Sequence, residues 1–183
     1  RKYFNLKEDI PVLACVGETR FDKGSDILLE ALNNVTEPFQ LLIAGRPVYF
    51  DEKYIFEKSQ KYSENVHTAL KFLSDDELMY AMNAADIIVL PYRRVFDAAS
   101  GPLGEGVVLE KCILGPDHGN LNDTITKNHL GFTFESENPG SLSKVINKIL
   151  KTDFVIDDNY KSYKASLKVE AFLSGYKNLY FNL

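Results

Sequence analysis

The stretch Asp86-Ile87-Ile88-Val89-Leu90-Pro91 places four consecutive apolar residues between an acidic residue and a proline. Such a run is expected for a central strand of a parallel sheet, because that strand is buried on both faces. Other apolar runs, over residues 11–16, 39–44 and 112–114, alternate with amphipathic segments along the chain. This alternation is typical of βαβ units, so the sequence predicts an α/β fold.

The alternation extends in both directions from this strand. Strands are predicted over residues 11–16, 39–44, 65–72, 86–91, 112–114 and 131–134, the last at an edge of the sheet. Helices are predicted over residues 25–32, 51–62, 121–127 and 141–150, with another that follows Ser100. Ser74-Asp75-Asp76-Glu77 forms a capping box for a further helix that ends at Ala84. Together these elements predict a Rossmann-like, three-layer α/β/α architecture with a mostly parallel sheet.

The length of 183 residues suits one domain with a full core and is short for two. We expect residues 11–155 to form the Rossmann-like domain. Residues 1–10 lack an initiator Met and lead directly into the first strand, so we interpret them as a remnant of an interdomain linker. Residues 156–183 hold more aromatic residues than one face of an isolated helix needs, so we expect a helical segment that packs on this domain or on an absent one.

The charge and cysteine content exclude several classes of function. The chain carries 21 basic and 26 acidic residues, a net charge of -5, which argues against nucleic acid as a partner. Cys15 and Cys112 lie in apolar segments without metal-ligand spacing, so we expect buried thiols. No apolar run approaches the roughly 20 residues of a membrane span, and no signal peptide opens the chain.

The segment from Asp97 to Glu105 reads as a loop that turns into a helix with an anion site at its start. Ser100 or Gly101 can be the N-cap, Pro102 suits the first helical position, and the free backbone N–H groups there suit a phosphate. Glu105 could accept hydrogen bonds from a ribose diol, and Asp97 from sugar hydroxyls. The alternative is a tightly packed helix start, with Glu105 stabilising the helix dipole and Asp97 bonded within its own turn.

Cationic residues follow the first two predicted strands. In the loop over residues 17–24, Arg20 and Lys23 stand beside a helix N-terminus, which is a favourable place for a diphosphate. Arg46 could add a third cation, although an Arg at a strand end is common. The alternative for this loop is ordinary solvated charge. His118 lies in a strand-end loop where it could meet a substrate, but a structural or solvated imidazole is the more usual case, and His67 has no clear role.

These stretches, in this order, resemble the C-terminal half of the family 4-type retaining glycosyltransferases of the GT-B fold, the glycosyl transferases group 1. The resemblance rests on residues 12–24 with Lys23-Gly24, residues 72–78 (Phe-Leu-Ser-Asp-Asp-Glu-Leu), residues 85–91, and the stretch from Asp97 to Asp117-His118-Gly119 and Leu130-Gly131-Phe132. The family carries an acidic residue, seven residues and then Glu, and Asp97 with Glu105 has this spacing. A rival register pairs Glu110 with Pro102 and lacks the first acid.

The resemblance implies a role for each site residue. Asp97 would contact the donor sugar, and Glu105 the nucleotide ribose. Ser100 and Gly101 would offer backbone N–H groups to the diphosphate, and Phe72 and Leu73 would lie near the base. Gly17, Lys23 and Arg20 complete the set; the family has Arg after this first Gly, where this chain has Glu18, and Arg20 could supply the missing charge.

The implied reaction transfers a sugar from a nucleoside diphosphate donor to an acceptor hydroxyl with retention. Because cations and amides would stabilise the departing diphosphate, no metal is required. The implied partners are a nucleotide-sugar donor, an absent N-terminal GT-B domain and a saccharide or lipid-linked acceptor, and the implied setting is cytoplasmic polysaccharide biosynthesis, with any membrane contact made by the absent domain. This chain alone should catalyse little. A non-catalytic nucleotide-binding module and a sugar-nucleotide epimerase stay open as alternatives.

Overall fold

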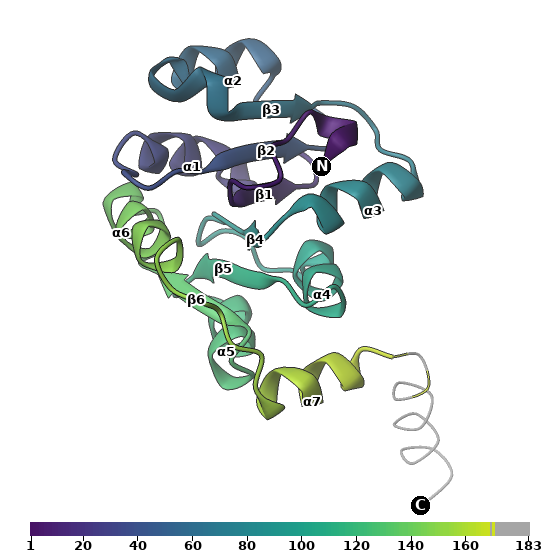
Figure 1. The fold of residues 1–183 in the computed structure, drawn as a ribbon. Helices are drawn as coiled ribbons and strands as arrows, with labels where there is room; N and C mark the ends of the chain where they lie inside the picture. Colours follow the sequence, from purple (N-terminus) through teal and green to yellow (C-terminus); the bar gives the residue numbers. More distant parts are fainter. Residues whose placement is uncertain (169, 171–183) are drawn as a thin grey trace, which may run out of the picture.

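The computed structural model describes residues 1–168 and 170 and contains one six-stranded parallel sheet (Figure 1). The strand order is β3-β2-β1-β4-β5-β6. The strands are β1 (Val12–Val16), β2 (Gln40–Ala44), β3 (Val66–Ala69), β4 (Ile87–Val89), β5 (Cys112–Pro116) and β6 (Gly131–Phe134). The prediction that residues 86–91 hold a central strand is confirmed, because β4 pairs with β1 and β5 and is fully buried. The strand order changes direction between β1 and β4, which is where open α/β sheets bind ligands.

Helices cover both faces of the sheet, as the three-layer prediction requires (Figure 1). One face holds α1 (Ser25–Leu32), α2 (Glu52–Lys58) and α6 (Pro139–Ile149). The other holds α3 (Asp75–Ala84), α4 (Gly101–Val108), α5 (Gly119–Lys127) and α7 (Asp158–Ser166). Successive residues of β1 alternate between the two layers: Ala14 packs under the α3–α4 layer, and Leu13 under the α1–α6 layer. The predicted α/β/α fold is therefore confirmed.

Three predicted boundaries differ from the structure for identifiable reasons. The helix predicted over 51–62 ends at Lys58 and is followed by the 3-10 helix η3 (Gln60–Asn65), because Tyr62 leaves the helical conformation and its buried hydroxyl donates to the Leu29 carbonyl. Ser100 is the N-cap of α4, so Pro102 is the second helical residue rather than the first. Asn138 caps α6, so Pro139 begins that helix instead of preceding it.

The segments at the two ends of the described region pack on the sheet. Residues 1–10 include the 3-10 helix η1 (Lys2–Phe4), whose Phe4 is buried, and the Arg1 guanidinium pairs with Asp86. Tyr160 of α7 is buried, and its hydroxyl donates to the Lys111 carbonyl. The predicted division at residues 10 and 155 stays a prediction, and its C-terminal part over residues 169 and 171–183 lies outside the described residues. No helix in the described part is long and apolar enough to cross a membrane.

Candidate active site at the carboxyl edge of the sheet

Three loops that leave the carboxyl ends of β1, β2 and β4 pack directly on one another. A Cβ atom at Gly45, after β2, would lie 2.0 Å from the carbonyl oxygen of Gly17, after β1. A Cβ atom at Gly24 would lie 2.0 Å from the carbonyl oxygen of Pro91, after β4. The backbone N–H of Arg93 also donates to the Asp22 carbonyl at 2.9 Å. The loops can approach this closely because glycine has no side chain, so the predicted site residues in them share one edge.

Lys23 lies where the first and third of these loops meet. It ends the 3-10 helix η2 (Phe21–Lys23), and its ammonium lies 3.7 Å from the ring centroid of Tyr92 and 4.0 Å from that of Phe96. Burial, and then the nearby charge of Arg20, lower the pKa of Lys23 to about 8. The group is therefore a partly desolvated cation at the edge where a diphosphate is predicted to bind.

The arginines of this edge are each paired with a carboxylate. Arg20, the N-cap of η2, bonds to Asp22 of that helix, and Arg46 bonds to Glu18. The Arg93 guanidinium makes a bidentate salt bridge with the Asp26 carboxylate of α1, with N–O distances of 3.0 and 2.6 Å. The Arg46–Glu18 pair joins the loops after β2 and β1, and the Arg93–Asp26 pair joins the loop after β4 to α1. The Arg20–Asp22 pair offsets much of the positive charge that Arg20 was predicted to offer a ligand.

The N-terminus of α4 and Lys23 both contact Tyr92. The Ser100 side chain accepts from the Leu103 N–H at 3.4 Å, and its oxygen lies 3.2 Å from the Tyr92 hydroxyl. In the described part of the chain, the backbone N–H groups of Ser100 and Gly101 have no acceptor. Pro102 contributes none, so the anion-binding capacity of this helix start rests on those two groups.

Glu105 lines a largely apolar hollow of about 370 Å³ beside α4. The lining residues are Met79, Gly101, Gly104, Glu105, Val108, Leu109 and Leu167. Burial raises the pKa of the Glu105 carboxyl. Glu110, the acid of the rival register, lies beyond the end of α4 and bonds to Lys164 of α7 at 2.8 Å. The two candidate acids therefore differ in setting: Glu105 is half-buried in a hollow and Glu110 is exposed and paired.

The remaining predicted residues are more dispersed. Asp97 is exposed in the loop before α4, and no hydrogen bond from its side chain occurs in the described part. Phe72 is 82% exposed in the loop before α3, whereas Leu73 packs against the core beneath that helix. His118 is the exposed N-cap of α5, and His67 lies in β3. Within residues 1–168 and 170, no three His, Cys, Asp or Glu side chains lie close enough to hold a metal ion.

Sequence reasoning missed Tyr92 and Phe96, which form the surroundings of Lys23. The sequence feature that could have indicated them is Tyr92, an aromatic residue directly after Pro91 at the end of a buried strand. A side chain at that place can reach the carboxyl edge, where the Tyr92 ring packs on Phe96. Pattern alone carried no sign that these rings meet a lysine about seventy residues earlier in the chain.

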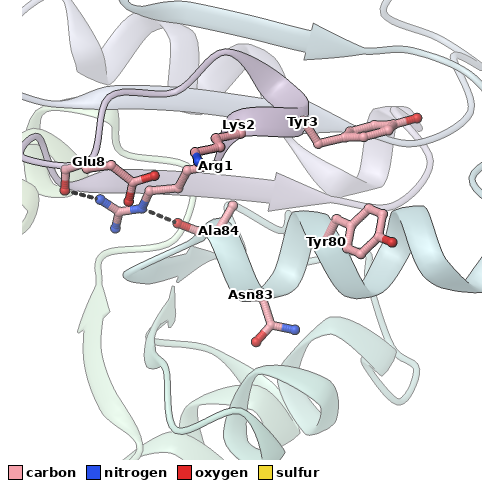
Figure 2. A pocket seen from close by; sticks show the side chains of 7 residues that line it. All are labelled: Arg1, Lys2, Tyr3, Glu8, Tyr80, Asn83 and Ala84. Atoms are coloured by element: carbon pink, nitrogen blue, oxygen red, sulfur yellow. Dashed lines mark hydrogen bonds between the residues drawn. The ribbon is translucent and has the colours of Figure 1, made fainter.

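A larger hollow, of about 820 Å³, lies at the other end of the sheet (Figure 2). It lies between η1 and the C-terminal end of α3, where the Arg1 guanidinium donates to the carbonyls of Ala84 and Glu8. None of the predicted site residues lines it. We therefore place the candidate site at the carboxyl edge, where charged groups and the helix N-terminus converge.

Comparison with known proteins gives a consistent result. Residues 1–166 match the family described as glycosyl transferases group 1, and no curated protein matches the chain. Sucrose-phosphate synthase from Thermosynechococcus elongatus superposes with a TM-score of 0.79 at 21% identity, over 98% of this chain and 47% of that one. Alr3699/HepE from Anabaena, solved in complex with UDP, gives 0.77 at 16% identity, over 94% of this chain and 49% of that one. The chain thus spans about half the length of these two proteins.

A third structure matches along most of its length. The C-terminal domain of the group 1 family protein LpcC from Francisella tularensis superposes with a TM-score of 0.69 at 15% identity, over 87% of this chain and 89% of that domain. At these identities the structures establish a shared fold.

Proposed function

Because the chain belongs to the glycosyl transferases group 1 family, we propose that it is the donor-binding half of a retaining glycosyltransferase. The whole protein would transfer a sugar from a nucleoside diphosphate to an acceptor hydroxyl. The observation that carries this proposal is that Tyr92 contacts both the Lys23 ammonium and Ser100, the N-cap of α4, while Glu105 lines a hollow on the same helix. The structure of Alr3699/HepE with UDP supports a nucleoside diphosphate as the ligand.

The diphosphate would lie between Lys23 and the start of α4. Lys23 and the N–H groups of Ser100 and Gly101 would stabilise the negative charge that grows on the departing diphosphate. Arg20 would add to this charge only by giving up part of its bond to Asp22. Since cations and amides can do this work, the proposed reaction does not require a metal ion.

The nucleoside would extend from the diphosphate along α4. Glu105 would accept hydrogen bonds from the ribose hydroxyls, and Gly104 leaves open space beside it for close approach. Phe72 and Leu73, in the loop before α3, would lie near the base. Asp97, exposed and free of bonds in the described part, would hold the donor sugar.

The acceptor side of the site would be supplied by the other half of the protein. Large apolar residues are exposed in the loops after four successive strands of this edge: Phe21, Val48, Tyr49, Phe72 and Val95. Exposed apolar patches of this kind mark interaction surfaces. We propose that a second GT-B domain covers this edge and that a saccharide or lipid-linked acceptor binds between the two.

The proposal is tested by titrating the chain calorimetrically with UDP, GDP and ADP. One nucleotide should bind, and Glu105→Ala and Lys23→Ala should each weaken that binding by more than about 1 kcal/mol, or roughly fivefold, because each removes a charge-assisted contact. Glu110→Ala and Lys53→Ala are matched controls, since both residues are exposed and lie elsewhere, and they should leave the affinity unchanged.

Two results would count against this assignment. A loss on Glu110→Ala that equals or exceeds the loss on Glu105→Ala would favour the rival register. Failure of all three nucleotides to bind either this chain or a longer protein containing it would favour a module that has the fold without the transfer chemistry.

A further inference from the structure

Lys23 is held differently from the other cations at the carboxyl edge. Arg20, Arg46 and Arg93 each bond to a carboxylate, and such a bond offsets the charge that a ligand would meet. In the described part of the chain, the Lys23 ammonium forms no ion pair, and it lies against the Tyr92 and Phe96 rings. Aromatic faces attract a cation without neutralising it. Lys23 is therefore fixed in place with its charge still available.

The two rings are themselves held firmly. Tyr92 is 2% exposed, and its ring centroid lies 4.5 Å from that of Phe96. The Tyr92 hydroxyl lies 3.2 Å from the oxygen of Ser100, the N-cap of α4. Through Tyr92, the position of Lys23 is tied to the helix start where the anion is proposed to bind.

We propose that Tyr92 and Phe96 are positioning residues that form an aromatic clamp, which places the Lys23 ammonium beside the N-terminus of α4 before an anion arrives. The identity of that anion, the donor diphosphate, rests on the proposed function. The clamp itself rests on the contacts between these three residues. Neither ring needs to touch the ligand.

The protonation of Lys23 should make the affinity for the anion depend on pH. The groups that face Lys23 are Arg20, Asp22 and Glu18 from its own loop, Cys15 from β1, and Tyr92. Desolvation dominates among these influences and lowers the pKa of Lys23 to about 8. A diphosphate bound at the ammonium would favour the charged form, so its affinity should fall as pH rises above about 8.

The first experiment observes the clamp without any ligand. Protons near the face of an aromatic ring resonate upfield, so the Lys23 side-chain methylene signals in proton–carbon NMR should lie upfield of those of exposed Lys53. Phe96→Leu should remove part of this shift, and Tyr92→Phe, which keeps the ring, should preserve it. Phe56→Leu, on exposed α2, is the matched control and should change nothing. Lys23 signals at the ordinary position would overturn the clamp.

The second experiment measures UDP and pyrophosphate affinity, with circular dichroism confirming that each variant folds. Phe96→Leu should weaken binding about three- to tenfold, the range expected for one cation–π contact in a partly desolvated setting. In the Lys23→Ala background the same substitution should have no further effect, because Phe96 acts through Lys23. Equal losses in both backgrounds, or no loss in the first, would overturn the positioning role.

A combined outcome separates the two proposals. If the upfield shift is present but pyrophosphate, UDP, GDP and ADP all fail to bind both this chain and a longer protein containing it, the clamp exists while its ligand and the proposed function both fail. If UDP binds and the shift is absent, the proposed function stands and the clamp is wrong.

Discussion

The effect of a Gly→Ala substitution on the free energy of unfolding depends on the position of the glycine. Gly45 has a φ of 140°, and a Cβ atom there would meet the Gly17 carbonyl, so Gly45→Ala should lower the free energy of unfolding by more than about 3 kcal/mol. Gly104 lies within α4 with open space beside it, so Gly104→Ala should raise that free energy by up to about 1 kcal/mol. Urea unfolding followed by circular dichroism checks both, and equal effects would contradict this account.

Gly104→Ala also tests the hollow beside α4. The added methyl group enters the proposed nucleoside position, so the variant should be more stable yet bind the nucleotide more weakly. A more stable variant with unchanged affinity would move the nucleoside away from Gly104.

Two titrating residues define an expected pH optimum for nucleotide binding. Glu105 accepts hydrogen bonds from ribose hydroxyls most strongly when ionised, and burial raises its pKa, so affinity should fall as pH decreases through that raised value. Lys23 must be protonated, and its pKa is about 8, so affinity should also fall at alkaline pH. Calorimetry between pH 5 and about 9.5 should show a maximum, with Glu105→Gln flattening the acid side and Lys23→Met the alkaline side. A wild-type profile identical to that of both variants would contradict these assignments.

At the scale of elements, the capping box of α3 should carry a measurable share of stability. The Ser74 oxygen accepts from the Glu77 N–H at 3.3 Å, and the Glu77 carboxylate accepts from the Ser74 N–H at 3.0 Å. Ser74→Ala should lower the free energy of unfolding by about 1 kcal/mol. Asp76→Ala, in the same turn but outside the box, should lower it by only about 0.3 kcal/mol through the helix dipole. Urea denaturation measures both, and equal losses would mean that the box adds nothing beyond charge.

The elements also show where local pattern succeeds. The helix over 25–32 and the strand over 131–134 have the predicted bounds, because their apolar spacing agrees with Gly24 before the helix and Gly131 at the start of the strand. The helix predicted over 51–62 is wrong beyond Lys58, because packing of Tyr62 against Phe39 and its bond to Leu29 outweigh helical continuity. Long-range packing determines where this helix ends, and the local spacing of apolar residues gives no information about that packing.

At the scale of the whole molecule, the two thiols should report global unfolding. Cys15 and Cys112 are buried in β1 and β5, and burial raises the pKa of Cys15 to about 11 and that of Cys112 to about 12. Because thiolates are the reactive form, both should resist a thiol reagent until the sheet opens. Labelling at increasing urea should follow the circular dichroism transition for both residues, and labelling of either one well before the transition would reveal local opening.

The amino-acid sequence by itself determined the class of fold, the order of its elements and the loops in which the polar residues gather. It could do so because burial on one or both faces leaves a periodic pattern in each segment, as in residues 86–91. Family resemblance then pointed to Lys23, Ser100 and Glu105. The roles of these residues in the candidate site stay predictions.

Only the tertiary structure decided which side chains meet at that edge. Strands β1 and β4 are neighbours although 70 residues separate them, and this adjacency brings Lys23 to Tyr92 and Phe96. The pairings of Arg46 with Glu18 and of Arg93 with Asp26 arise in the same way. Local periodicity records whether a residue is buried, whereas the choice of partner follows from strand order and loop packing.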